Sequence, residues 1–453
     1  MKKKISMDMT EGVIWKLLLR FAVPLMLSEL VQTLYSMVDS VIVGRFCGTE
    51  ALAAVGATGN VVKMLVGFFT GISVGYTVVV GQNFGKKDEQ GVKDSVHTIV
   101  SLSLLLGIVL TIVGVLITDP ILRMLDTPAD VFSLAAIYVR TYFMGIIGLV
   151  MYNTAAGILR AVGDSANPAK FLLISSVLNV VLDLVLVIWI PMGVRGVALA
   201  TVISQLVSAV LAFRVLLAAD GPYRVNPKEL ILRKGILAKI FSNGLPIGLQ
   251  KFLTSFSNVI VISYMSPFGS TCLAGWAIYT KLHHLTMIML QSIGSAETTF
   301  VSQNVGKGDY GRVRSCVRVA SAMSVIALAV VGVLLYIFVP SVAGVWGDDA
   351  EVIAYAVMFV RTILTLEITH AFNQVFAGAL RGMGKAAVST LAMIAGLVCG
   401  RQIYLYFITK VIYTPQVVGI AYPVGWLSAG ILLFIVYKRA MGKMAARPAP
   451  QQA

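Results

Sequence analysis

Twelve apolar stretches divide this sequence, and each is long enough to cross a lipid bilayer. A helix that spans the hydrocarbon core needs about 20 consecutive apolar residues. Only 13% of the residues are charged and 58% are hydrophobic, whereas a soluble domain carries about 25% charge. Because a water-soluble shape cannot bury that much apolar surface, the sequence predicts an all-α membrane protein with twelve transmembrane helices. The expected spans are 14–43, 51–81, 95–118, 130–158, 169–190, 196–217, 238–265, 272–301, 315–339, 351–379, 388–409 and 416–437.

Lysine and arginine are distributed unevenly between the two sides of these spans. An even number of spans puts both termini on one side; the tails and loops there hold 25 Lys and Arg residues, against 4 in the opposite loops. Basic loops are typical of the cytoplasmic side, so we expect both termini in the cytoplasm. The net charge of +15 then follows mostly from topology. The expected partner is the lipid bilayer, and no nucleic-acid partner is expected.

Three short segments of the first half recur 221 residues later in the second half. The pairs are GQNFGKK (81–87) with SQNVGKG (302–308), YVRTY (138–142) with FVRTI (359–363), and GILRAVGD (157–164) with GALRGMGK (378–385). A repeated unit with an even number of spans keeps its direction through the membrane. The sequence therefore predicts two parallel six-helix repeats related by an axis along the membrane normal.

The repeat sets the expected domain boundaries. We expect an N-lobe over 1–217, a polar and basic cytoplasmic linker over 218–237, a C-lobe over 238–437 and a cytoplasmic tail over 438–453. Two such bundles are typical of transporters that rock around a central cavity, here expected to be V-shaped.

The sequence carries no motif that indicates catalysis. It has no Walker A motif, its four histidines lack metal-ligand spacing, and its four cysteines form no CxxC pair. We therefore expect a transporter that is not an enzyme and that carries no cofactor.

Four polar residues of the first half fall at one expected depth, near the outer ends of their spans. Asp39 precedes Gly44 by five residues and Asp183 precedes Pro191 by eight. A helix rises about 1.5 Å per residue, which places these carboxylates roughly 7–12 Å below the outer surface. The four residues are Asp39, Asn179, Asp183 and Thr201.

This set offers only oxygen ligands, which suit a small hard cation such as Na⁺. Two close carboxylates repel each other, so a proton can replace a metal ion there. The alternative is that each aspartate separately bonds the backbone of a neighbouring helix. The second half does not copy the site, since its counterparts are Ile260, Gly400 and Tyr404.

Two acids of the second half are secondary candidates. Glu297 and Glu367 lie within expected spans, where ionisable groups are expensive and often functional. They either neutralise a cationic substrate or form structural bridges with basic residues of the same half. The basic residues considered are Lys281, Arg361 and Arg401.

Three stretches carry a resemblance to a known family. They are VDSVIVGRFCGTEALAAVG (38–56), GILRAVGDSANP (157–168) and NVVLDLVLVIWIPMGVRGVALAT (179–201). Together with the two-fold repeat, they resemble the multidrug and toxic compound extrusion (MATE) transporters over nearly the whole chain. The similarity is to the DinF-like prokaryotic branch, which includes the MepA-type exporters.

The resemblance implies which residues bind cation and substrate. The family's N-lobe cation site falls on Asp39, Asn179, Asp183 and Thr201, and these residues bind Na⁺ if the protein is sodium-coupled. The polar lining of the substrate cavity falls on Gln32, Tyr35 and Asn153. The NorM-like branch also uses a helix 7 acid; Thr254 stands near that place, so a C-lobe cation site of that type is not expected.

The resemblance further implies a secondary active multidrug efflux transporter of the bacterial cytoplasmic membrane. Lipophilic or cationic organic compounds leave by alternating access, in antiport with Na⁺ or H⁺, and the first helix bends near Pro24. We expect a monomer. The alternative is a lipid-linked precursor flippase of the same superfamily, whose cavity is usually lined by arginines; Arg140, Arg361 and Arg401 are the candidates here.

Overall fold

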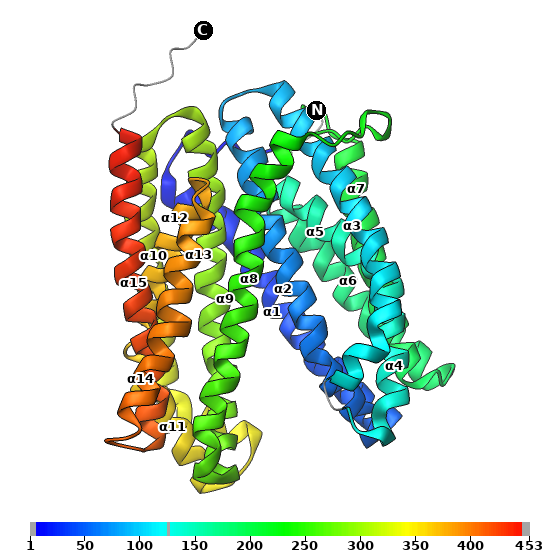
Figure 1. Ribbon diagram of the computed structural model, residues 1–453, viewed down its shortest axis with the longest axis vertical. Helices are drawn as coiled ribbons and strands as arrows, with labels where there is room; N and C mark the ends of the chain where they lie inside the picture. The colour runs from blue at the N-terminus through cyan, green and yellow to red at the C-terminus, as the bar shows by residue number, and fades with distance from the viewer. Residues whose placement is uncertain (1–5, 125–126, 446–453) are drawn as a thin grey trace. The chain divides into compact units, whose positions relative to one another are not determined.

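The computed structural model describes residues 6–124 and 127–445, with side chains except at 52, 57, 60–64 and 445. All long regular elements in these ranges are helical, and they form twelve segments that match the twelve predicted spans (Figure 1). The predicted fold class is confirmed.

Six segments belong to the first repeat. They are α1 (Ile14–Ile42), α2 (Thr49–Gly85), α3 (Glu89–Met124), the pair α4 (Ala129–Met144) and α5 (Ile146–Ala161), α6 (Ala166–Leu184) and α7 (Gly193–Leu217). π-helical turns extend α1 over Val43–Cys47 and α6 over Val185–Trp189.

Six more form the second repeat. They are α8 (Lys234–Met265), α9 (Gly269–Lys307), α10 (Tyr310–Ala343), the pair α11 (Ala350–Leu364) and α12 (Ile368–Gly382), the pair α13 (Ala386–Ile394) and α14 (Arg401–Ile408), and α15 (Pro415–Ala445). A π-helical stretch (Ala395–Gly400) joins α13 to α14.

The repeat is visible in backbone details that share the 221-residue offset. Gly48 and Gly269 both have φ +89° at the first inter-helix turn of their repeats, a conformation that is essentially restricted to glycine. The α4–α5 and α11–α12 pairs are bent by 45° and 53° at equivalent places. The two halves therefore share the helix breaks as well as the helix order.

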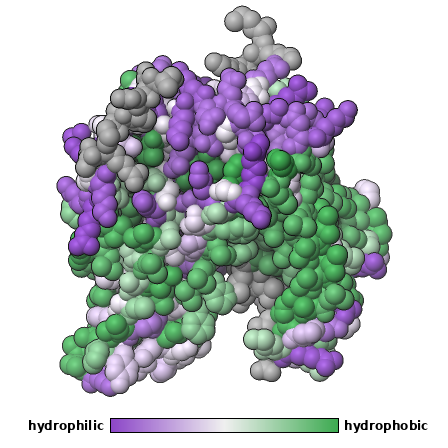
Figure 2. Space-filling view, turned by 45° about the horizontal axis from the view of Figure 1, so that its top comes forward, coloured by the Kyte–Doolittle hydropathy of each residue, from purple (hydrophilic) through white to green (hydrophobic). Residues whose placement is uncertain are grey.

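Membrane-spanning character follows from length and apolarity. Among the described residues, eight helices meet both criteria alone, and up to ten if each bent pair is one span. One of these stretches, Lys234–Lys307, contains both α8 and α9. Large apolar side chains are exposed along the helices, including Leu116, Val330 and Leu391. Figure 2 shows a broad hydrophobic region on this face, with hydrophilic residues gathered above and below it. Exposed apolar surface on this scale fits a lipid environment.

The chain forms two compact units, and each contains a piece of the other's first helix. Unit 1 comprises Met1–Asp8 and Val23–Leu245, and unit 2 comprises Met9–Ala22 and Pro246–Ala453. The divisions in α1 and α8 fall next to Pro24 and at Pro246, where a helix lacks one backbone hydrogen bond. The lobe boundaries expected at 217 and 238 stay a prediction.

Among the described residues of unit 1, two apolar clusters follow the helices. The first joins α2, α3, α5 and α7 around Tyr76, Ile99 and Ile158. The second lies nearer the opposite ends of the helices. It includes Val43 and Val187 of the two π-helical turns, together with buried residues of α4 and α7. This second cluster holds the ends of α1, α6 and α7 in place.

The linker after α7 packs on α3. The backbone N–H of Asn226 donates to Nε2 of His97 (3.0 Å), and Glu229 pairs with Lys93 (2.7 Å). Arg233 pairs with Asp94 (3.0 Å). Lys93 holds the pKa of the Glu229 carboxyl below its usual value.

Candidate cation site and its surroundings

The C-terminal parts of α1 and α6 and the N-terminal part of α7 bring together the four residues predicted to bind a cation. The Asp39 and Asp183 carboxyl groups lie within interaction distance of each other. Nδ2 of Asn179 donates to Oγ1 of Thr201 at 3.5 Å, and the Thr201 hydroxyl donates to the Val197 carbonyl (3.1 Å). The predicted depth and the shared face of Asn179 and Asp183 are therefore consistent with one cluster.

Both aspartates stand just before a π-helical turn. The turn Val43–Cys47 begins four residues after Asp39, and Val185–Trp189 begins two residues after Asp183. π-helical turns are rare and frequently mark functional sites, because the wider turn re-aims the neighbouring side chains.

The cluster holds four buried oxygen atoms that have no hydrogen-bond partner among the described residues. They are Oδ1 of Asp39, Oδ1 of Asn179 and both carboxylate oxygens of Asp183. Asp183 is 0% exposed and Asn179 is 2% exposed. A buried carboxylate is costly unless it is paired or protonated. The cluster is therefore electrostatically incomplete without a cation or a proton.

The ligand set limits which cation fits. The described residues contain no group of three or more His, Cys, Asp and Glu side chains that could hold a metal ion. Two carboxylates, one amide and one hydroxyl form a small all-oxygen set, which suits a hard monovalent ion or a proton.

Two tyrosines that the sequence analysis missed face this cluster from α4. Tyr138 interacts with both aspartates and with Tyr35. One turn further along, the hydroxyl of Tyr142 accepts a hydrogen bond from Nε2 of Gln205 (3.4 Å). A signal was present, since YVRTY (138–142) is a repeated motif whose two tyrosines are four residues apart and share one helix face.

The predicted cavity residues fall into two places. Gln32 and Tyr35 lie together on α1, and Tyr35 also interacts with Asp39 and Asp183. Asn153 on α5 lies elsewhere: its amide donates to the Leu149 carbonyl (2.9 Å), and its own carbonyl accepts from Ser73 (2.8 Å).

A basic residue adjoins the Asn153 group. Arg160 donates to Ser73 Oγ (2.9 Å) and interacts with Glu29 of α1. Glu29 interacts with Tyr35 as well, so one polar strip along α1 connects Arg160 to the aspartates.

Glu367 of unit 2 is paired, but with none of the basic residues considered from the sequence. It lies at the α11–α12 break, 1% exposed, with Oε1 2.7 Å from Nδ1 of His283. Thr286 donates to the same oxygen. The rings of Tyr279 and Trp426 stack on His283. The expectation of Lys281, Arg361 or Arg401 as partner was wrong, because α9 presents His283 to this position instead.

Glu297 lies deep between α9 and α12 and is fully buried. Its charge neighbour is Arg381, again not one of the three basic residues considered. Gly378 makes the placement possible, because a Cβ there would stand 2.9 Å from Oε2 of Glu297.

The described residues form twelve helical segments in two repeats of six, and eight to ten spans among them are long and apolar enough to cross a membrane. With the buried acidic cluster in the first repeat, this arrangement defines a polytopic membrane protein of the two-lobe transporter type. A family model described as MatE matches residues 24–185 and 246–403, which is more than half of the chain. The chain therefore belongs to the MatE family, as the sequence resemblance predicted.

Relatives of known name agree with this assignment. YoeA of Bacillus subtilis (strain 168), a probable multidrug resistance protein, is 26% identical over 96% of each chain. The multidrug export protein MepA of Staphylococcus saprophyticus is 20% identical over 85% of each chain. The fold also matches an outward-facing multidrug resistance MATE family transporter of the MOP superfamily, with a TM-score of 0.91, 23% identity, and 99% of this chain and 100% of that chain covered. The homologues are transporters, not enzymes.

Proposed function

We propose that this protein exports lipophilic or cationic organic compounds across the bacterial cytoplasmic membrane in antiport with Na⁺ or H⁺. The supporting observation is the Asp39–Asp183 pair, whose buried oxygens lack partners. In the proposed orientation both termini lie in the cytoplasm, as the basic loops on that side indicate. We further propose that it works as a monomer without a cofactor.

Coupling in this proposal arises from the repulsion between the two carboxylates. A bound Na⁺ or proton cancels that repulsion and stabilises the conformation in which Asp39, Asn179, Asp183 and Thr201 converge. The organic compound binds another conformation better, so the two ligands oppose each other. Such coupling requires only a differential affinity of each ligand for the two states.

The first helix is the proposed link between ion and substrate. α1 carries Asp39 as well as Gln32 and Tyr35, and Pro24 removes one of its backbone hydrogen bonds. A change at Asp39 therefore acts directly on the helix that lines the proposed substrate site. We propose that α1 bends near Pro24 during the cycle.

The proposed substrate class rests on the side chains beside the ion site. Tyr35 is only partly buried, and its aromatic face can attract an organic cation by about 0.5–2 kcal/mol. Tyr138 and Tyr142 are buried beside it. The names of the relatives, which describe multidrug resistance and export, point to the same class.

The lipid-linked precursor flippase is less well supported. Arg140 is neutralised by Asp119. Arg401 is buried and donates to Ser257 (3.1 Å) and Asn258 (2.8 Å). Two of the three arginines considered for an anion-binding cavity are thus engaged within their own units.

Efflux of ethidium from proteoliposomes tests the proposal. A Na⁺ gradient and a pH gradient are imposed separately on the wild type, Asp183→Asn and the matched control Asp130→Asn, which changes an exposed acid of α4. We expect one of the gradients to drive efflux in the wild type and the control, but not in Asp183→Asn. Absence of efflux under both gradients, with folded protein, contradicts the proposal.

A further inference from the structure

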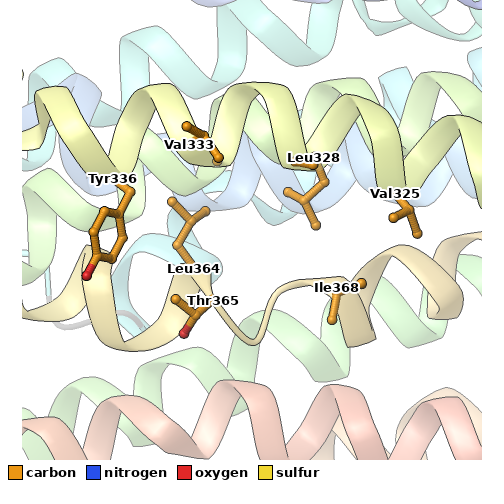
Figure 3. Close-up of a pocket in the computed structure, with 9 residues that line it drawn as sticks. Val325, Leu328, Val333, Tyr336, Leu364, Thr365 and Ile368 are labelled. Atoms are coloured by element: carbon orange, nitrogen blue, oxygen red, sulfur yellow. The ribbon is translucent and has the colours of Figure 1, made fainter.

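A cavity lies in unit 2, where α10 passes the break between α11 and α12. Its volume is about 250 Å³, and its lining is almost entirely apolar. Figure 3 shows Leu364 and Thr365 at the end of α11 and Ile368 at the start of α12, opposite Val325, Leu328 and Val333 of α10. The cavity lies at the bend of 53° between α11 and α12.

The cavity opens on a lipid-facing surface. In the most apolar part of the span that contains α10, only 17% is buried inside the protein. Lining residues on the open side remain exposed, with Val333 at 57%, Tyr336 at 44% and Ile368 at 42%. Exposed Val330, also on α10, continues the apolar surface beside the opening. In a membrane this surface contacts acyl chains.

A positive charge stands at the rim of this cavity. The Arg361 guanidinium lies 5.2 Å from the centre of the Tyr336 ring, and Arg361 is exposed. The ion pairs found among the described residues include none for Arg361. A charge on a membrane-spanning segment is expensive and usually has a functional reason.

The first repeat shows how such an arginine is otherwise neutralised. The counterpart of Arg361 at the 221-residue offset is Arg140, which pairs with Asp119 of α3. The counterpart of Asp119 is Pro340, so the second repeat lacks the acid.

The equivalent place in unit 1 is packed differently. In unit 1 the ring of Phe143 lies against Gly114, so closely that a Cβ on Gly114 would overlap it. Their counterparts in unit 2 are Leu364 and Leu335, and Leu364 lines the cavity. The second repeat thus has the smaller Leu364 in place of Phe143 and the larger Leu335 in place of Gly114.

We propose that an anionic phospholipid binds here, with its phosphate on Arg361 and an acyl chain in the cavity. The unpaired guanidinium and the Tyr336 edge complement a phosphate, since hydrogen bonds between charged groups are roughly twice as strong as neutral ones. The apolar lining complements the chain. A cationic compound is disfavoured by Arg361, so this site is distinct from the proposed export route. It does not depend on the identity of the transported compound.

Native mass spectrometry of the detergent-purified protein tests this site. Phosphatidylglycerol and zwitterionic phosphatidylcholine are titrated against the wild type, Arg361→Ala, Gly332→Phe and the matched control Arg140→Ala. Gly332 lines the cavity, and a Cβ there would stand 3.9 Å from Leu364, so its phenylalanine variant fills the space.

The wild type and Arg140→Ala should bind phosphatidylglycerol more tightly than phosphatidylcholine. Arg361→Ala should weaken phosphatidylglycerol binding about tenfold, the fold-change expected from one lost charge-assisted bond, and remove the preference. Gly332→Phe should weaken the binding of both lipids. If this variant does not fold, Ala329→Leu, at an exposed position of the cavity lining, is used in its place.

Equal binding of phosphatidylglycerol by the wild type and Arg361→Ala would overturn the proposal. Equal losses in Arg361→Ala and Arg140→Ala would also overturn it, because general charge attraction then explains the binding. If the cavity takes up a neutral apolar compound and the protein shows no preference for phosphatidylglycerol, the proposal is also overturned, because the cavity then binds a different kind of ligand.

Discussion

Asp183 of α6 faces Asp39 of α1, and while both carboxylates are ionised neither oxygen of Asp183 accepts a hydrogen bond from a described residue. Asp183 is completely buried, so solvent does not stabilise its charge. Asn179 and Thr201 complete a set of oxygen ligands around the pair. The arrangement resembles a binding site more than a structural contact, because structural carboxylates in protein interiors are normally paired or hydrogen-bonded.

The two carboxylates should behave as one functional element. We predict that Asp39→Asn and Asp183→Asn each reduce ion-driven ethidium efflux about tenfold or more, as expected for losing a typical coupling free energy. The double variant should be no worse than either single one, since groups that act as a unit are non-additive. Initial efflux rates in proteoliposomes measure this. Additive losses would show that the two aspartates act independently.

The His283–Glu367 pair should contribute strongly to the stability of unit 2. Glu367→Gln replaces the charged acceptor beside His283 and Thr286 by a neutral amide, and a buried hydrogen bond to a charged group contributes about 1.5–3 kcal/mol. We expect a clear decrease in the thermal unfolding midpoint of the detergent-solubilised protein. The matched control is Glu351→Gln, which changes an exposed acid in the first turn of α11. Equal midpoints for Glu367→Gln and the wild type would assign the pair no structural role.

Much of the fold and part of the site could be predicted from the sequence for simple physical reasons. Bilayer thickness fixes the length of a span, and a helix rises by a constant amount per residue. Counting from Gly44 and Pro191 therefore placed Asp39 and Asp183 at one depth. The breaks in α4–α5 and α11–α12 could not be predicted in this way, because they interrupt continuous apolar stretches.

Pairings between distant helices were harder to predict. Glu367 and His283 are separated by 84 positions, and the sequence does not show which face of α9 turns toward α12. The substitution of Asp119 by Pro340 between the repeats was readable in the sequence. Its consequence for Arg361 became clear only when the structure placed Arg361 beside Tyr336 and the cavity.

Gly378 should be intolerant of even a methyl group. A Cβ there would stand 2.9 Å from Oε2 of Glu297 and 2.9 Å from the Gly294 carbonyl, so α9 and α12 would have to separate. Overpacking of this kind costs about 1–3 kcal/mol. We expect Gly378→Ala to lower the thermal unfolding midpoint, whereas Gly442→Ala in α15, which has no neighbour within 4 Å, should not. A midpoint unchanged in Gly378→Ala would mean that the two helices are more loosely packed than described.

The contact between the linker and α3 should weaken in acid. Lys93 holds the pKa of Glu229 below its usual value, so the ion pair favours the docked linker above the ordinary glutamate pKa of about 4.3. This contribution is lost as the pH falls through the lowered pKa of the docked state. Hydrogen exchange of residues 224–233 should therefore accelerate, relative to α3, below about pH 4. Glu229→Gln should show the faster exchange already at neutral pH and lose the pH dependence. Because the pair is solvent-exposed, high salt should reduce the difference between wild type and variant. Exchange in the wild type that does not change with pH, after correction for the intrinsic rate, would show that the Asn226–His97 hydrogen bond and the Arg233–Asp94 pair hold the linker without Glu229.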